Sequence, residues 1–143
     1  MLYNASEVAN FIVSTCYMKD NPVSNLKLQK LLYFCWIDYF RETSRSLFID
    51  DICAWRLGPV VPEVYYEFCS YGGRPICFSC NTCIDQNNDS VLLGKIIDKY
   101  LLTSASTLVE RSHRPGGAWD SIYKNGAGNR NVIPYELIRQ LDC

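Results

Sequence analysis

The feature that most constrains the fold is the segment Leu26–Phe40, which is apolar on almost every side of a helix. Ser24 stands where an N-cap is expected, and the pattern predicts a helix that runs to about Arg41. A helix of this kind buries most of its surface and is surrounded by other elements. Its charged residues share one narrow face, which we expect to be exposed: Lys27, Lys30, Asp38 and Arg41.

The rest of the chain carries helix signals separated by short breaks. Asn4 and Glu7 have capping-box spacing before the first apolar stripe. Helices are expected at about residues 5–16, 62–70, 89–102, 105–113, 119–123 and 134–141, with a turn at Gly58-Pro59. We predict a mainly α, compact single-domain bundle of six or seven short helices over residues 1–143, with a small β-hairpin or short strands around residues 47–55 and 75–79.

Charge and cysteine content exclude several classes of protein. A net charge of −1 over 143 residues argues against a general polyanion binder. The eight cysteines would suggest disulfides in a secreted protein, but the N-terminus has no signal-peptide pattern. The longest apolar run, Leu31–Ile37, is seven residues and too short to cross a bilayer. We therefore expect a cytoplasmic protein with reduced thiols and no membrane partner.

Two patterns suggest chemistry. Cys77, Cys80 and Cys83 have the spacing of thiolates that share a Zn²⁺ ion, with Cys69, Cys53 or His113 as a fourth ligand. Free thiols are the favoured interpretation, and no cofactor is expected. His113, the only histidine, could pair with a cysteine in catalysis. No third member of such a set is identifiable, and a histidine at a helix C-terminus has a simpler structural role.

A nucleic-acid role has one candidate patch. Its members lie in the C-terminal third of the chain: Arg111, Arg114, Lys124 and Arg130. No basic run accompanies them, and a solvated rim around loops is the favoured interpretation. Nucleic acid is therefore not the expected partner.

Three segments together resemble a known family. They are Leu26–Phe34, Ala54–Tyr65 and His113–Trp119, and in this order and spacing they resemble the Panacea domain of SocA-like antitoxins and phage-associated proteins. The resemblance implies a mainly helical fold without established catalytic residues or cofactor. The residues that carry it are expected to be scaffold: Leu28, Leu31, Leu32, Phe34, Trp55, Gly58, Pro59 and Trp119.

The resemblance also implies a function. We expect a non-enzymatic antitoxin in a bacterium, prophage or phage that neutralises a cognate protein toxin by direct binding. One alternative is a phage-encoded inhibitor of a host defence protein, or an adaptor that delivers a target to a protease. A thiol- or metal-dependent hydrolase is a further alternative, and a homo-oligomer stays open.

The partner-binding surface is expected outside the scaffold. Three residues within the motif segments and one directly after the second segment need not be buried, and two more lie in the loop 73–89, whose cysteine-rich stretch 77–83 departs from the family pattern. These candidates are Lys27, Lys30, Glu63, Tyr66, Arg74 and Phe78. Exposed aromatic and arginine residues are frequent anchors of protein interfaces.

Overall fold

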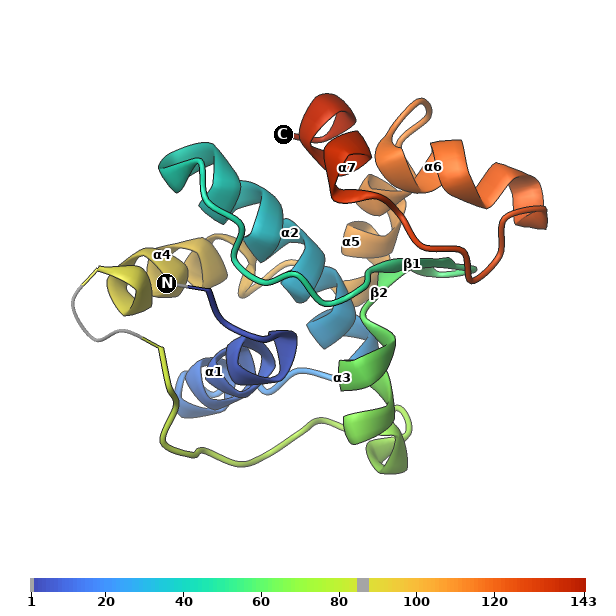
Figure 1. The fold of residues 1–143 in the computed structure, drawn as a ribbon. Helices are drawn as coiled ribbons and strands as arrows, with labels where there is room; N and C mark the ends of the chain where they lie inside the picture. The colour runs from blue at the N-terminus through green and yellow to red at the C-terminus, as the bar shows by residue number, and fades with distance from the viewer. Residues whose placement is uncertain (1, 85–87) are drawn as a thin grey trace.

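The apolar segment forms the central helix α2 (Asn25–Thr43), which crosses the middle of the molecule (Figure 1). The computed structural model describes residues 2–84 and 88–143. The Ser24 hydroxyl accepts a hydrogen bond from the Lys27 backbone N–H, so the predicted N-cap is confirmed. The helix ends two residues beyond the predicted Arg41, where Ser44 adopts a left-handed conformation with φ 57°.

The other helices surround α2. The described residues form seven α-helices in all, as predicted, and α2 packs against α1, α3, α4 and α5. The capping box of Asn4 and Glu7 is confirmed at the start of α1. The six further helices are α1 (Ala5–Met18), α3 (Pro62–Glu67), α4 (Asp89–Tyr100), α5 (Ala105–Ser112), α6 (Ala118–Tyr123) and α7 (Tyr135–Leu141), with 3₁₀ turns η1 (Cys69–Tyr71) and η2 (Lys124–Gly126).

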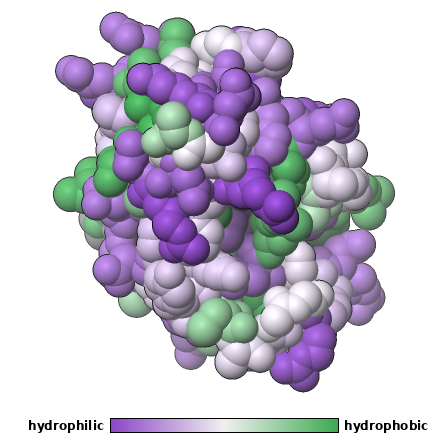
Figure 2. Space-filling view, turned by 90° about the vertical axis from the view of Figure 1, so that its right-hand side faces the viewer, coloured by the Kyte–Doolittle hydropathy of each residue, from purple (hydrophilic) through white to green (hydrophobic). Residues whose placement is uncertain are grey.

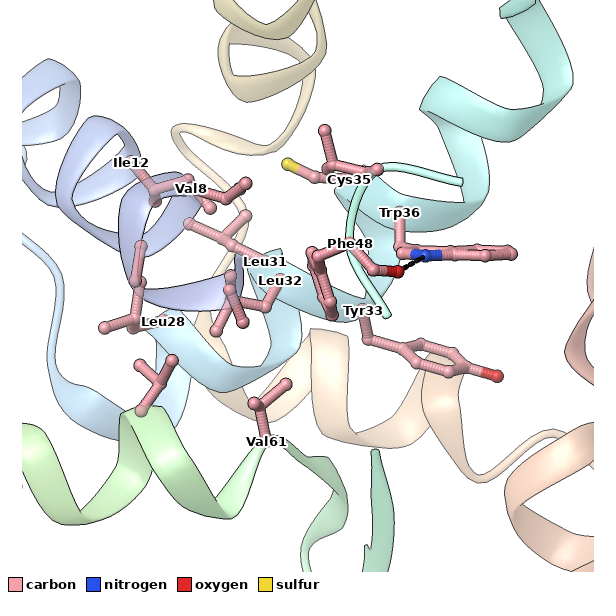
Figure 3. Packing of buried hydrophobic residues seen from close by; sticks show 14 of the residues in the cluster. Val8, Ile12, Leu28, Leu31, Leu32, Tyr33, Cys35, Trp36, Phe48 and Val61 are labelled. Atoms are coloured by element: carbon pink, nitrogen blue, oxygen red, sulfur yellow. Dashed lines mark hydrogen bonds between the residues drawn. The ribbon is translucent and has the colours of Figure 1, made fainter. Parts of the chain in front are cut away.

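The core lies along α2 and includes the predicted scaffold leucines. Leu28, Leu31 and Leu32 are fully buried against α1 and the start of α3, as the close view in Figure 3 shows. Trp36 is also fully buried, and its indole N–H donates to the Phe48 backbone oxygen at 2.9 Å. This bond fixes the segment after α2 against the helix because a buried indole N–H needs an acceptor.

A two-stranded hairpin follows the core segment. Strand β1 (Cys53–Trp55) pairs antiparallel with β2 (Gly58–Val60), which confirms a strand within residues 47–55 and a small hairpin, although β2 lies beyond the predicted range. The prediction of a turn at Gly58-Pro59 is wrong, since both residues lie in β2 and the turn is formed by Arg56 and Leu57. Pro59 is tolerated in β2 because this is an edge strand. At position 59 the backbone nitrogen points away from β1, so the missing N–H removes no hydrogen bond between the strands.

A third segment, residues 130–133, covers the free edge of β1. The Arg130 N–H donates to the Ala54 oxygen at 2.6 Å, and the Ala54 N–H donates to the Asn131 oxygen at 2.8 Å. The Ile133 N–H donates to the Ile52 oxygen at 2.7 Å. These bonds bring a distant part of the chain beside Trp55.

The segment 75–79 forms no strand, so this part of the fold prediction is wrong. A strand needs a neighbouring strand for its backbone groups, and this segment instead runs across the surface near α1. Its backbone bonds go elsewhere: the Ile76 N–H donates to the Val23 oxygen at 2.8 Å, and the Cys80 N–H donates to the Ser14 hydroxyl at 3.0 Å. Residues 85–87 of the predicted loop lie outside the described residues.

The narrow charged face of α2 is not the exposed face that the sequence predicts. Lys30 and Asp38 are both buried. Asp38 accepts hydrogen bonds from the Tyr100 hydroxyl at 2.6 Å and from the Lys99 ammonium at 3.1 Å. In the part of the chain that the structure describes, no helix is long and apolar enough to span a bilayer.

Candidate functional site

Lys30 lies at the point where the predicted motif segments meet. Its side chain is 0% exposed, and its ammonium donates to the Pro59 backbone oxygen at 2.8 Å. Burial lowers the pKa of Lys30 from 10.5 to about 7, because a charged ammonium is costly away from water. The prediction that Lys30 offers a partner-binding surface is therefore wrong: the residue joins α2 to β2.

Gly58 allows this close approach. Its φ is +114°, a conformation that side chains with a Cβ rarely adopt. A Cβ built here would lie 2.6 Å from the Ser112 hydroxyl and 2.7 Å from Lys30 Cε. The hairpin, α2 and the end of α5 thus touch at a position that only glycine fits.

The third motif segment, His113–Trp119, also contacts the hairpin. We call the place around Lys30 where the three motif segments meet "the junction". The Trp119 indole N–H donates to the Trp55 backbone oxygen at 2.8 Å, and the His113 ring stacks on Trp119 with 3.8 Å between centroids. Burial and the nearby Lys30 charge lower the pKa of His113 below its usual 6.5. His113 Nε2 is buried without a hydrogen-bond partner among the described residues. The histidine therefore packs as a ring in the junction.

The junction holds a groove beside the Trp55 side chain, which we call the Trp55 groove. Its volume is about 540 Å³. Tyr65 packs edge-on against Trp55 with 4.9 Å between ring centroids, and the Arg130 guanidinium lies 4.2 Å above the Trp55 ring. Its lining residues come from the start of α2, the hairpin, α3, η1 with the glycine after it, and the segment before residue 131: Asn25, Leu26, Gln29, Trp55, Arg56, Leu57, Val60, Tyr65, Cys69, Gly72, Asn129 and Arg130.

A hydrogen-bond chain fixes the floor of the Trp55 groove. The Gln29 amide accepts from the Val61 N–H at 2.9 Å and donates to the Asn25 side chain at 3.0 Å. Asn25 in turn donates to the Tyr65 backbone oxygen at 3.1 Å. Because Gln29 and Asn25 are buried and bonded, they tie α2 to the start of α3 and hold the groove in one shape.

The surface around the groove mixes polar and apolar groups. Tyr66 is 59% exposed and Leu57 is 45% exposed. Figure 2 views the molecule from the side where the hairpin and α6 end, and it shows small hydrophobic patches between hydrophilic ones. Transient protein interfaces have this mixed character, with Trp, Tyr and Arg enriched among the residues that dominate affinity.

The structure separates the predicted partner-binding residues. Tyr66 lies at the groove, 6.2 Å from Trp55 between ring centroids, and Glu63 is exposed on the same helix. Lys27 is half-buried and donates to the Leu101 oxygen at 2.8 Å. The other two lie in the loop after η1: the Arg74 guanidinium bonds the backbone of its own turn, and Phe78 stacks on Phe68 at 6.2 Å.

Sequence reasoning missed Arg130 as a neighbour of Trp55. It placed Arg130 in a patch with Arg111 and Arg114, but those two line a shallow depression at the end of α5. The bridging bonds of residues 130–133 to β1 carry Arg130 to the groove instead. The segment offers only two apolar residues, Val132 and Ile133, and they do not indicate which part of the fold it contacts.

The cysteines of the described region are free thiols. Cys77, Cys80 and Cys83 are exposed, whereas Cys16 and Cys35 lie in the core as the helical pattern predicts. Burial raises the pKa of Cys16 to about 11. Over residues 2–84 and 88–143, no group of three His, Cys, Asp or Glu side chains is placed to hold a metal ion.

Comparison with known proteins gives a family match. The family described as "Antitoxin SocA-like, Panacea domain" matches residues 28–120, which include Lys30, Trp55 and His113 but not the groove residues Asn25 and Arg130. A curated relative, Antitoxin SocA of Caulobacter vibrioides (strain NA1000 / CB15N), is 37% identical over 140 residues, an alignment that covers 87% of this chain and 72% of the relative. No solved structure matches the chain.

Proposed function

Because the chain belongs to the family of SocA-like antitoxins with a Panacea domain, we propose that it neutralises a cognate protein toxin by binding it directly. We place this role in the cytoplasm of a bacterial cell, as the similar antitoxin is bacterial. The Trp55 groove is the proposed contact surface. The observation that carries this assignment is the cluster formed by half-buried Trp55 with the exposed Tyr66 and Arg130.

The composition of the cluster supports a protein partner. Trp, Tyr and Arg are the side chains that most often contribute large shares of binding free energy at interfaces. Here they contact one another: the Arg130 guanidinium lies over Trp55 and reaches the Tyr66 hydroxyl at 3.5 Å. Side chains that already support one another lose little conformational freedom when a partner docks, which favours affinity.

Neutralisation by binding requires no reacting group in this chain. A stable interface buries about 1,200–2,000 Å² in total. Such an area, centred on the groove, would extend over the Arg56-Leu57 turn and the exposed face of α3 that carries Glu63. We propose that the chain blocks its target by occupying this area, as a non-enzymatic inhibitor.

Co-expression in a bacterial host tests the proposal. The protein encoded by the adjacent gene is induced alone and together with this chain, and growth is followed. We expect the adjacent gene to arrest growth and the wild-type chain to restore it. An adjacent gene that is harmless alone, or an arrest that this chain leaves unchanged, contradicts the proposal.

A matched pair of variants connects the effect to the Trp55 groove. Tyr66→Ala removes an exposed ring at the groove, and Phe78→Ala removes a half-buried ring in the loop after η1. Both variants are checked for folding by circular dichroism. We expect Tyr66→Ala to weaken protection and Phe78→Ala to retain it when both proteins accumulate to equal levels. The reverse order would place the contact on the loop.

A further inference from the structure

Two arginines in the Trp55 groove have no acidic partner in the described part of the chain. Among residues 2–84 and 88–143, Arg56 makes no ion pair, and the polar interactions of the Arg130 guanidinium are with the Trp55 ring and the Tyr66 hydroxyl. Some other arginines pair with a nearby carboxylate, whereas the exposed Arg74 and Arg111, outside the groove, form no ion pair in the described chain. Arg45 pairs with Asp89 at 3.3 Å, and Arg114 pairs with Asp142 at 2.9 Å.

The lining of the groove holds no carboxylate to balance these charges. Its charged members are Arg56 and Arg130, and the remaining members are apolar, aromatic or neutral polar residues. An arginine fork donates several N–H groups in one plane, which matches the two oxygens of a carboxylate. The groove therefore presents two guanidinium groups that can each bind a carboxylate. They lie beside a wall formed by Trp55, Tyr65 and Leu57.

The position of Arg130 favours binding over free motion in solvent. Its backbone N–H donates to the Ala54 oxygen at 2.6 Å, and its guanidinium carbon lies over Trp55, 4.2 Å from the ring centroid. Stacking leaves the edge of the guanidinium free to donate. A carboxylate that enters the groove thus meets a donor already held in place.

We propose that the partner segment entering the Trp55 groove is acidic, with Asp or Glu side chains for Arg56 and Arg130 and a large apolar side chain for the wall. This inference rests on the proposed function and specifies the chemistry of the toxin surface. The occupant is a protein segment, since two arginines are few for a nucleic-acid backbone and the whole chain carries a net charge of −1.

Selection from a phage-displayed library of random dodecapeptides tests the chemistry without knowledge of the toxin. The full chain is immobilised, and the recovered sequences are compared with those recovered on the double variant Arg56→Gln, Arg130→Gln. The matched control is Arg111→Gln, an exposed arginine outside the groove that forms no ion pair in the described chain.

We expect the wild-type chain and the Arg111→Gln control to enrich peptides in which Asp or Glu flanks a large apolar residue. Enrichment should fall at least about tenfold on the double variant, and it should fall with rising salt because exposed charge pairs are screened. Enriched peptides without acidic residues, equal enrichment on the double variant, or no enrichment at all would overturn the inference. A nucleic-acid ligand would be revealed by a gel shift that the double variant abolishes, which also overturns it.

The growth assay separates failure of this inference from failure of the proposed function. If the double variant still protects cells as well as wild type, while Tyr66→Ala does not, the groove binds the toxin but the inference of an acidic partner segment is wrong. If wild type gives no protection, the proposed function itself is wrong.

Discussion

Gly58 is a residue that we expect to tolerate substitution poorly, because both its backbone conformation and its close neighbours require glycine. Its φ of +114° strains any L side chain, and an added Cβ would meet Lys30 and Ser112 at under 3 Å. We predict that Gly58→Ala lowers the free energy of unfolding by roughly 2–4 kcal/mol, from backbone strain plus overpacking. Urea denaturation followed by circular dichroism measures the loss.

Gly73→Ala is the control for this prediction. Gly73 is exposed, and a Cβ there meets nothing within 4 Å. Its replacement should change stability by no more than about 0.5 kcal/mol. Equal losses for the two variants would mean that the close approach of Lys30 to β2 does not stabilise the fold.

Lys30 gives the protein a specific dependence of stability on pH. Its pKa is about 7 in the folded chain against 10.5 in the unfolded chain, so between these values the unfolded state holds a proton that the folded state has released. Stability should therefore rise by about 1 kcal/mol per pH unit from pH 7 to pH 8.5. The lowered pKa of His113 acts in the same direction near pH 6.

The substitution Lys30→Met isolates this effect. The variant should lose the rise between pH 7 and 8.5, whereas Lys95→Met, which changes an exposed lysine, should keep it. Urea denaturation at pH 7.0, 7.75 and 8.5 provides the three free energies for each protein. If the free energy of unfolding rises with pH as steeply in Lys30→Met as in the wild-type chain, the buried ammonium is not the cause of the rise.

Helix α2 is the element on which the rest of the fold depends. Its buried face contacts α1, α3, α4, α5 and β2, so a cavity there weakens several contacts at once. We predict that Leu32→Ala costs about 2–5 kcal/mol of stability. Leu102→Ala, at a position 86% exposed, should cost less than about 0.5 kcal/mol. A small loss for Leu32→Ala in thermal or urea unfolding would contradict the central position of α2.

The elements differ in how far the sequence predicts them. Apolar stripes and caps are local, and they predicted α2 and the N-caps at Asn4 and Ser24. Burial of Lys30 was not predictable, because a lysine on a narrow polar stripe is normally solvated and only the docking of β2 covers it. The strand expected at residues 75–79 failed for a similar reason: its apolar residues pack on the core without a partner strand.

The candidate site is a property of the whole molecule. It joins the start of α2, the hairpin, α3 and the segment around Arg130, which are distant in sequence. The motif residues are predictable because they share local patterns, and Tyr66 was identified as an exposed residue on this basis. The pairing of Arg130 with Trp55 depends on backbone bonds between residues 130–133 and β1, and no periodicity encodes such a contact.

The central claim is that the Trp55 groove binds a protein toxin, and calorimetric titration tests it most directly. The purified product of the adjacent gene is titrated into the wild-type chain, Tyr66→Ala, Arg130→Gln and the control Arg111→Gln. We predict saturable binding to wild type and to Arg111→Gln, with affinity at least about tenfold lower for the two groove variants. Absence of binding to wild type, or equal affinity for all four proteins, would contradict the account.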